Sequence, residues 1–237
     1  MSELRQQDRQ NLIVLGVGRK GSGKSRLLMR RYVPHFPRML TLDQTGEARE
    51  AYPHAIEARG LVNVYNAIRE LHVASDGKGW HVIAVLDVYE VEALFARLAP
   101  PYAGGKPSLS VTLGGVCVEC SEVDVIAPAN GTAQSITDAI ARGRHYRLSL
   151  LLATQRPHQC SRMLSSQADE IFSFRMHEPR DLAWLRQGCG AVFARTVTRL
   201  VRYHYAHYDS ETGEVTHVDD YGRAVCVEVD TDQPDLL

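Results

Sequence analysis

The sequence predicts an α/β fold in which a mainly parallel sheet carries helices on both faces, followed by a small C-terminal β-hairpin extension. Apolar runs typical of strands alternate with helix-like segments from Asn11 to Arg186, and this alternation is typical of a parallel sheet covered on both faces. Leu148–Thr154 is almost entirely apolar, as expected of a central parallel strand. The tail changes to β-rich sequence around a turn at residues 209–213, which predicts the hairpin.

Short apolar runs rich in β-branched residues predict the strands of the core: Asn11–Val17, Arg38–Asp43, Trp80–Asp87, Val111–Cys120, Leu148–Thr154 and Glu170–Arg175. Apolar residues at helical spacing predict the helices between them: Lys24–Tyr32, Leu61–Val73, Tyr89–Leu98, Ala133–Gly143, Arg162–Ala168 and Pro179–Arg186. Pro100 and Pro101 end the third of these helices, because proline cannot continue a helix.

The tail predicts three further strands: Thr198–Tyr208, Glu214–Val218 and Ala224–Val229. We expect a polar N-terminal segment at residues 1–10, a core at residues 11–196, and a β-rich extension of the same domain at residues 197–237. The tail is too short to form an independent core.

Composition and charge exclude several classes of protein. The formal net charge is −1, which excludes a generally basic, histone-like nucleic-acid binder but permits a local basic patch. The N-terminus lacks a signal-peptide pattern, and no apolar run approaches the ~18–20 residues that span a bilayer. We therefore expect a soluble protein that is not secreted. The five cysteines favour reduced thiols over a disulfide framework, and the pair Cys117-x-x-Cys120 lacks the second pair that completes a zinc site.

A phosphate-binding motif stands between the first strand and the first helix. Residues 18–25 (GRKGSGKS) match G-x-x-x-x-G-K-[ST] in the strand-to-helix context that the motif requires. The glycines let backbone N–H groups surround phosphates, Lys24 would reach the β- and γ-phosphates, and the Ser25 hydroxyl would bind Mg²⁺. The motif predicts ATP and Mg²⁺ as cofactors and these nucleotide-binding residues: Gly18, Arg19, Lys20, Gly21, Ser22, Gly23, Lys24, Ser25 and Arg26.

Three segments resemble one ATPase superfamily. Residues 143–157 (GRHYRLSLLLATQRP) are similar to the stretch of FtsK/HerA-superfamily ATPases that enters a hydrophobic strand ending in "ATQRP". Residues 42–47 (LDQTGE) resemble its "D-x-x-G-E", and residues 165–185 also fit. The resemblance implies a RecA-like P-loop NTPase core, assembled as a homo-oligomeric ring, often a hexamer, with double-stranded DNA passing through the middle. In size the chain resembles the genome-packaging ATPases of membrane-containing viruses.

The expected function is therefore ATP-driven translocation of double-stranded DNA in viral genome packaging. Capsid or membrane portal proteins would be partners, and the location would be the cytoplasm or the virion. Two alternatives stay open: a cellular HerA-like DNA-processing ATPase, and a nucleotide switch or small-molecule kinase without DNA activity. A third, a structural ATP-binding subunit with weakened catalysis, is suggested by Ser121. The loop from Pro101 to Pro107, which carries Lys106, is a candidate channel loop.

The acid that activates water has two candidate positions. The superfamily supplies an apolar strand ending in Asp-Glu, and residues 116–124 (VCVECSEVD) match it in two registers. In the first, Glu122 is the catalytic acid and Ser121 replaces the usual Asp, binding Mg²⁺ through a water molecule. In the second, Glu119 is the acid on the Mg²⁺ side. We prefer the first, because residues 123–126 continue the match; alternation along the strand would let Glu119 compensate for the charge that Ser121 lacks.

Further residues are candidates for the γ-phosphate. Gln155 ends the strand of the "ATQRP" match, where a polar side chain can reach the phosphate or the attacking water. Asp43 ends a strand on the same edge. An arginine from a neighbouring subunit could neutralise the transition state; Arg144 in the GRH stretch is the first candidate for this role in trans, and Arg175 is the second.

Overall fold

The computed structural model describes residues 11–100 and 107–229. The predicted N-terminal segment and nearly all of the predicted channel loop, Lys106 included, lie outside these residues. The strands are β1 (Ile13–Val17), β2 (Arg38–Leu42), β3 (Ile56–Arg59), β4 (Trp80–Val85), β5 (Val116–Cys120), β6 (Leu148–Thr154), β7 (Glu170–Phe174), β8 (Tyr205–Asp209), β9 (Glu214–Val218) and β10 (Ala224–Val229).

Helices connect these strands. The α-helices are α1 (Lys24–Arg31), α2 (Ala48–Ala51), α3 (Leu61–Ala74), α4 (Val88–Leu98), α5 (Leu109–Thr112), α6 (Val123–Ile126), α7 (Gln134–Arg142), α8 (Met163–Gln167) and α9 (Pro179–Arg199). The 3₁₀ turns are η1 (Val33–His35), η3 (Gly143–Tyr146) and η4 (Pro157–Gln159). Among the helices of the described ranges, none is long and apolar enough to cross a bilayer.

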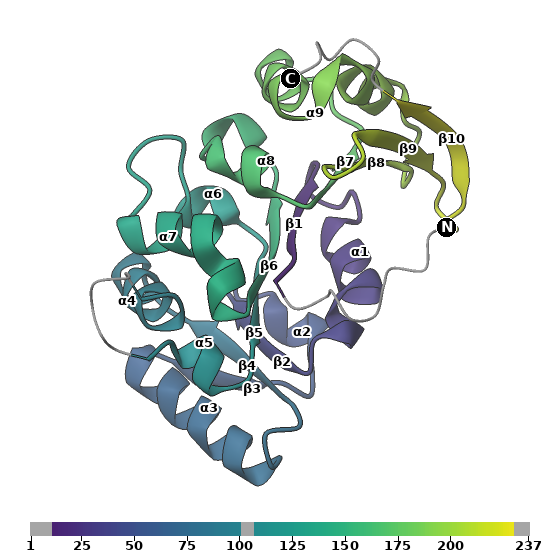
Figure 1. The fold of residues 1–237 in the computed structure, drawn as a ribbon. Coiled ribbons are helices and arrows are strands. Elements are labelled where there is room, and N and C mark those ends of the chain that lie inside the picture. The colour runs from purple at the N-terminus through teal and green to yellow at the C-terminus, as the bar shows by residue number, and fades with distance from the viewer. Residues whose placement is uncertain (1–10, 101–106, 230–237) are drawn as a thin grey trace.

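All ten strands form one sheet, in the order β10-β9-β8-β7-β1-β6-β5-β2-β4-β3 (Figure 1). From β7 to β3 every neighbouring pair is parallel, whereas β7, β8, β9 and β10 pair antiparallel. The predicted α/β class, the mainly parallel sheet and the hairpin extension are therefore confirmed. The extension continues the core sheet, and the predicted boundary between residues 196 and 197 falls inside α9.

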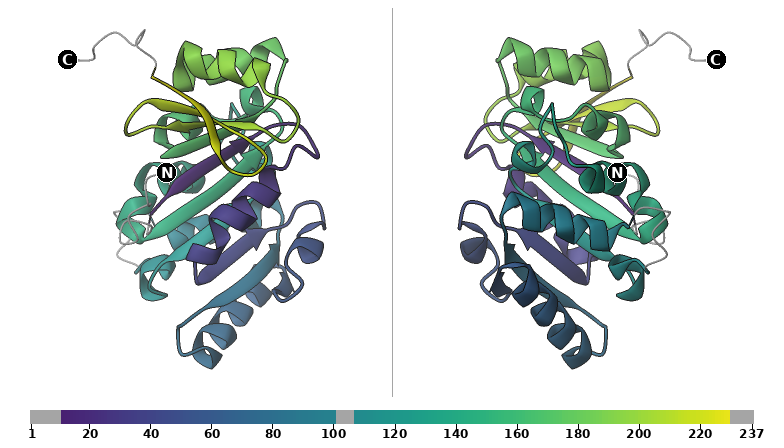
Figure 2. Two further views of the ribbon diagram at one scale, coloured as in Figure 1. Left: turned by 90° about the vertical axis from the view of Figure 1, so that its right-hand side faces the viewer. Right: turned by 90° about the vertical axis from the view of Figure 1, so that its left-hand side faces the viewer.

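Two apolar layers cover the sheet. Helix α1 packs on one face, where Leu28 and Tyr32 meet Val14, Leu151 and Phe172 of the strands. Helices α3, α4, α7, α8 and α9 contribute to the larger core on the other face (Figures 1 and 2). All seven residues of β6 are buried, which agrees with its almost wholly apolar sequence and its place in the middle of the sheet.

Three sequence-based boundaries were wrong, and one strand was missed. Strand β5 begins at Val116 and not at residue 111, because Gly114 (φ 78°) and Gly115 (φ 105°) turn the chain after α5. Helix α9 continues to Arg199, so residues 198–204 do not form the expected strand. Its two halves are separated by Gly190, whose φ of 86° and ψ of 171° are not helical. The short edge strand β3 was not predicted.

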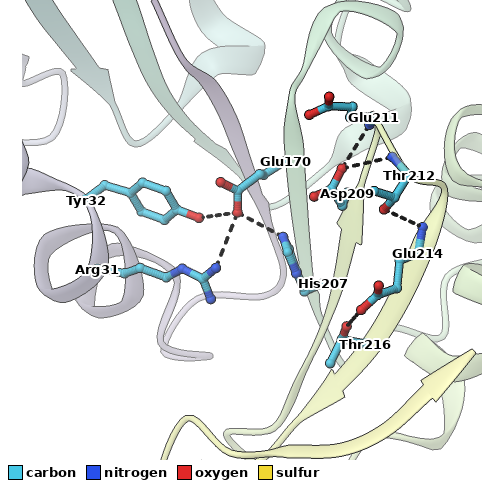
Figure 3. A network of polar contacts seen from close by, with 9 residues as sticks. All are labelled: Arg31, Tyr32, Glu170, His207, Asp209, Glu211, Thr212, Glu214 and Thr216. Atoms are coloured by element: carbon cyan, nitrogen blue, oxygen red, sulfur yellow. Dashed lines mark hydrogen bonds and ion pairs between the residues drawn. The ribbon is translucent and has the colours of Figure 1, made fainter. Parts of the chain in front are cut away.

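A buried carboxylate fixes α1 to the antiparallel extension. Glu170, at the start of β7, accepts hydrogen bonds from Tyr32 Oη (2.7 Å) and from His207 Nε2 on β8 (2.9 Å). Arg31 Nη2 lies 3.4 Å from the same oxygen (Figure 3). The ring of His207 also stacks on Phe172, at a centroid distance of 4.7 Å. The far end of the helix that follows the phosphate-binding motif is thus tied to β7 and β8.

Candidate nucleotide site

The phosphate-binding motif forms a tight loop at the carboxyl end of β1. The N–H of Gly18 donates to the Thr154 carbonyl (3.2 Å), which joins the loop to the end of β6. A Cβ at Gly18 would lie 2.8 Å from Ser22 Oγ and 2.9 Å from Phe174 Cβ, at a φ of 154°. Gly23 has a φ of 109° immediately before α1. Gly18 must therefore be glycine because a side chain would clash with its neighbours. Gly23 must be glycine because its positive φ is unfavourable for other residues.

Lys24 is buried under this loop. Its Nζ donates hydrogen bonds to the carbonyl oxygens of Gly18 (2.7 Å) and Arg19 (3.0 Å). Burial lowers the pKa of Lys24 to about 8, and the negative charges of Glu122 and Asp124 oppose that shift. The two acids that follow β5 are thus close enough to act on the lysine electrostatically.

A cavity of about 150 Å³ lies beside the loop. Ser25 and Met29 of α1 form one wall, and the end of β2, the segment that leads into α2, and the end of β5 form the others. The cavity brings together Ser25, Ser121, Glu119 and Glu122, four residues predicted for the metal and for catalysis. Asp43 lines it as well. The side chain of Asp43 accepts from the N–H groups of residues 45, 46 and 48, so it shapes the loop after β2.

Glu119 lines this cavity from the next-to-last position of the buried strand β5. It is 2 % exposed and accepts a hydrogen bond from Thr41 Oγ1 (2.9 Å) on the neighbouring strand β2. Burial raises the pKa of Glu119, and the neighbouring Tyr52 and Thr41 hydroxyls oppose that rise. None of the ion pairs within residues 11–100 and 107–229 involves this carboxylate.

Three neighbours of Glu119 were missed by sequence reasoning. Thr41 also lies 2.8 Å from His81 Nε2, and the His81 ring packs on Tyr52 at a centroid distance of 4.4 Å. Burial lowers the pKa of His81 to about 4, so the ring is neutral at pH 7. Burial and the neighbouring Glu119 raise the pKa of Tyr52. These residues come from β2, from the position just after α2 and from β4, and no local motif marks them.

Gln155 follows β6, the strand that lies between the phosphate-loop strand β1 and the acid strand β5. The preceding residue, Thr154, donates to Asp124 Oδ1 (2.8 Å) and accepts from the N–H of Arg156 (3.0 Å). His158, in the same loop, lies with Nδ1 2.6 Å from the buried Asp181 of α9. The loop that carries Gln155 is thus fixed to the segment after β5 and to α9.

The two candidate arginines lie at opposite ends of the parallel strands. Arg144 precedes β6, at the edge away from the phosphate loop, and pairs with Asp169. Arg175 follows β7, the neighbour of β1, and therefore lies at the edge of the phosphate loop. Its Nε donates to His177 Nε2 (2.9 Å). Arg144 is thus excluded from its own subunit's phosphate loop; the trans roles of both arginines stay predictions.

The flanking residues of the motif are exposed. Arg19, Lys20 and Arg26 all have exposed side chains, and Lys20 pairs with Glu47 (3.2 Å) across the loop. The remaining predicted residues, Gly21 and Ser22, complete the turn before Gly23. The whole predicted nucleotide-binding set therefore forms one continuous structure, in which Gly18 and Lys24 are buried.

Comparison with known proteins identifies the fold. No family model matches the sequence, and no curated protein is significantly similar to it. The structure is similar to the genome-packaging NTPase B204 of Sulfolobus turreted icosahedral virus 2 in its sulfate complex, with a TM-score of 0.71 and 24% identity over 88% of this chain and 96% of that one. The AMPPCP complex of the same protein gives a TM-score of 0.70 at 23% identity, covering 89% and 97%.

A more distant similarity is to the pCW3 conjugation coupling protein TcpA with ATPγS. Its TM-score is 0.54 at 13% identity, over 85% of this chain and 58% of TcpA. The fold that the resemblance implied is thus confirmed: this chain has the P-loop NTPase fold of the genome-packaging NTPase B204.

Proposed function

We propose that this protein hydrolyses ATP to move double-stranded DNA, as a hexameric ring that packages a viral genome in the cytoplasm or on the virion. One observation carries the proposal: the fold brings Lys24, Ser25 and Glu122 together at one edge of the sheet. The likeness to a protein described as a DNA-packaging ATPase supports it. Capsid or membrane portal proteins are the partners that this setting requires.

The loop is built to hold the phosphates of ATP. Its backbone N–H groups and the start of α1 favour negative charge. Lys24 bonds to two loop carbonyls, and phosphate oxygens would replace them as its partners. Because its pKa is about 8, Lys24 is mainly charged at pH 7 and can neutralise the β- and γ-phosphates.

The residues also fit Mg²⁺, which would reduce the charge on the phosphates. Mg²⁺ prefers oxygen donors and keeps several waters, and Ser25, Ser121 and Glu119 all offer oxygen atoms at the cavity. Within the described residues no group of three or more His, Cys, Asp or Glu side chains could hold a metal ion without other ligands. Phosphate oxygens would therefore complete the set, with Ser121 acting through water and Glu119 supplying charge.

Glu122 and Gln155 act on the attacking water in this proposal. Glu122 lines the cavity beside Ser25 and would accept a hydrogen bond from the water. Gln155 would orient the water or contact the γ-phosphate from the end of β6. An arginine from the neighbouring subunit, Arg144 first and Arg175 second, would offset the charge that develops on the γ-phosphoryl group.

Turnover of two variants tests the site. Lys24→Ala should abolish ATP hydrolysis, because the phosphates lose the lysine of the loop. Glu122→Gln should keep ATP binding and lose hydrolysis by about 10²-fold or more, because an amide is a poor base. Wild-type turnover in Lys24→Ala would refute the phosphate-loop assignment. If Glu119→Gln is inactive and Glu122→Gln is active, the second register holds.

A mixing experiment tests the trans arginine. Arg144→Ala and Glu122→Gln should each be inactive alone but regain partial turnover in mixed rings, because some interfaces then hold one intact acid and one intact arginine. No recovery in rings shown to be mixed would remove Arg144 from this role. The same experiment with Arg175→Ala then tests the second candidate.

Assembly and DNA dependence separate this proposal from the alternatives. A ring motor should become larger in solution with a non-hydrolysable ATP analogue and should hydrolyse ATP faster with double-stranded DNA. A monomer that ignores DNA would instead be a nucleotide switch or a small-molecule kinase. A ring without turnover would be the structural ATP-binding subunit that Ser121 suggests.

A further inference from the structure

Helix α9 and the turn after it carry an unusual charge pattern. Residues 179–203 contain five arginines, no lysine and one carboxylate, although the chain as a whole has a formal net charge of −1. The arginines are Arg180, Arg186, Arg195, Arg199 and Arg202. A one-sided charge run of this kind in a near-neutral protein marks a local electrostatic surface.

All five arginines are exposed. The one acid of the segment, Asp181, is 1 % exposed and faces His158, so it does not neutralise them. Across the part of the chain that the structure describes, no ion pair involves any of the five. Arg202 lies over the ring of the exposed Tyr203, 4.8 Å from its centroid.

Folding of the helix does not account for this arrangement. Arg180 lies in the first turn of α9, where the helix dipole disfavours positive charge. Arg195 and Arg199 are four residues apart on the same side, and like charges at that spacing destabilise a helix. An external anion that neutralises these charges would account for both features.

The arginines lie on the side of α9 that faces away from the core. Trp184, Phe193 and Val197 of the helix are buried, and Phe193 packs against Tyr208 of β8 at a centroid distance of 5.9 Å. Helix α9 covers the end of the sheet formed by β7, β8 and β9 (Figures 1 and 2). Its N-terminal half also contacts the Gln155 loop through His158 and Asp181.

We propose that the outward face of α9, together with Arg202, binds the phosphate backbone of double-stranded DNA. The inference rests on the proposed function, which supplies the polyanion. Guanidinium groups bind phosphate oxygens in a bidentate manner, and such contacts are independent of base sequence. The surface thus suits a motor that holds DNA of any sequence, and His158 links it to the loop of Gln155.

The test compares two doubly neutralised variants of the full chain. Arg195→Gln/Arg199→Gln removes two charges from α9 and keeps helix-forming side chains. Arg69→Gln/Lys78→Gln removes two exposed charges from α3 and the turn after it, near the opposite end of the sheet. Binding of a fluorescent 30-bp DNA duplex is measured by anisotropy between about 50 and 200 mM salt, where phosphate contacts dominate the salt dependence.

The α9 variant should bind DNA about tenfold more weakly. In a plot of log K against the logarithm of the salt concentration, its slope should be shallower by about 1.8, since each lost phosphate contact removes about 0.9. The α3 variant should stay within about twofold of wild type. Arg195→Lys/Arg199→Lys should restore most of the affinity, because the charge is kept. Equal weakening in the α9 and α3 variants, or no weakening in either, would overturn the proposal.

Two further readouts separate the possible causes. ATP turnover without DNA should be unchanged in the α9 variant, so a failure of the proposed ATPase activity is seen independently of DNA affinity. A polyglutamate peptide should compete weakly with the duplex. If it displaces DNA from the wild type at equal charge concentration and binds the α9 variant poorly, the surface is a docking site for an acidic protein and the DNA proposal is overturned.

Discussion

Two buried glutamates on the same face of the sheet differ in the partners that the fold gives them. Glu170 of β7 receives a tyrosine, an arginine and a histidine from α1 and β8 (Figure 3). Glu119 of β5 receives the Thr41 hydroxyl and lines the cavity beside the phosphate loop. Burial tends to raise both pKa values, but the His207 and Tyr32 contacts leave that of Glu170 lowered, whereas that of Glu119 is raised.

By this difference Glu170 is a structural acid, whereas Glu119 is available to interact with a bound cation. The hydrogen-bonding capacity of Glu170 is used to join α1 to the extension, so the charge of this carboxylate is stabilised in the folded protein. The negative charge of Glu119 is only weakly stabilised by its protein neighbours. A cation bound at the cavity would provide the missing electrostatic stabilisation. Substitutions at the two positions should therefore affect different properties.

The largest expected effect is on stability. Glu170→Ala should lower the free energy of unfolding by about 3–5 kcal/mol, because Arg31 and His207 lose the partner of their buried contacts. Urea unfolding followed by circular dichroism measures the change. A loss below about 1 kcal/mol would contradict the structural role of Glu170.

A milder substitution tests one contact of the same cluster. Tyr32→Phe removes the 2.7 Å hydrogen bond to Glu170 and keeps the ring in place, so unfolding should become easier by about 1.5–3 kcal/mol, the range for a hydrogen bond to a charged group. The same urea titration reports it. Val33→Ala, on the half-buried residue that follows Tyr32, serves as a control without a link to Glu170.

The two acids should give pH dependences of opposite sign. Glu170 has a lowered pKa, so its stabilisation is complete above the unfolded value of about 4.5 and is lost as the pH falls through the folded pKa. Glu119 has a raised pKa, so wild-type stability falls relative to Glu119→Gln as the pH rises above about 4.5. Each slope is at most about 1.4 kcal/mol per pH unit. Urea unfolding of wild type and both Gln variants from pH 3.5 to 7 measures them, and slopes of equal sign would contradict the comparison.

The smallest expected effect on stability is that of Glu119→Gln at about pH 4, where the Glu119 carboxyl group of the folded wild type is protonated and as neutral as the amide. The amide keeps the shape of the side chain and can still accept the Thr41 hydrogen bond, so unfolding should change by less than about 1 kcal/mol. The affinity for Mg²⁺ with ATP, measured by titrating turnover with Mg²⁺, should weaken. Unchanged Mg²⁺ dependence would mean that Glu119 does not compensate for Ser121.

The sequence alone predicted those features of the structure whose determining residues lie close together in the chain. The phosphate loop is encoded in eight consecutive residues, and its glycine positions follow from backbone geometry alone. Strand β6 was predicted with correct bounds because both of its faces are buried and its sequence is apolar throughout. The order of β7, β1, β6 and β5 was not predicted, since it depends on pairings between distant segments.

The remaining errors have physical causes. Strand β3 has four residues, lies at the sheet edge and exposes Ile56, so it lacks an apolar pattern. The second half of α9 is rich in valine and threonine, which favour strands locally, but burial of Val197 and Phe193 keeps it helical. Thr41 lies 78 residues from Glu119 in the chain. The Glu170 partners Tyr32 and His207 lie 138 and 37 residues away, and all three separations are beyond any local pattern.

Gly190 has a mechanical consequence for α9. A continuous helix behaves as a rod, so a tilt at one end reaches the other. The break at Gly190, with its φ of 86°, divides α9 into one body held by His158 at the nucleotide edge and another held by Tyr208 on β8. Spin-label distances between Gln187 and Thr198, with and without an ATP analogue, would measure the angle between the bodies. We expect the break to confine such a tilt to the first half, so that the arginines of the second half would keep their place on the sheet.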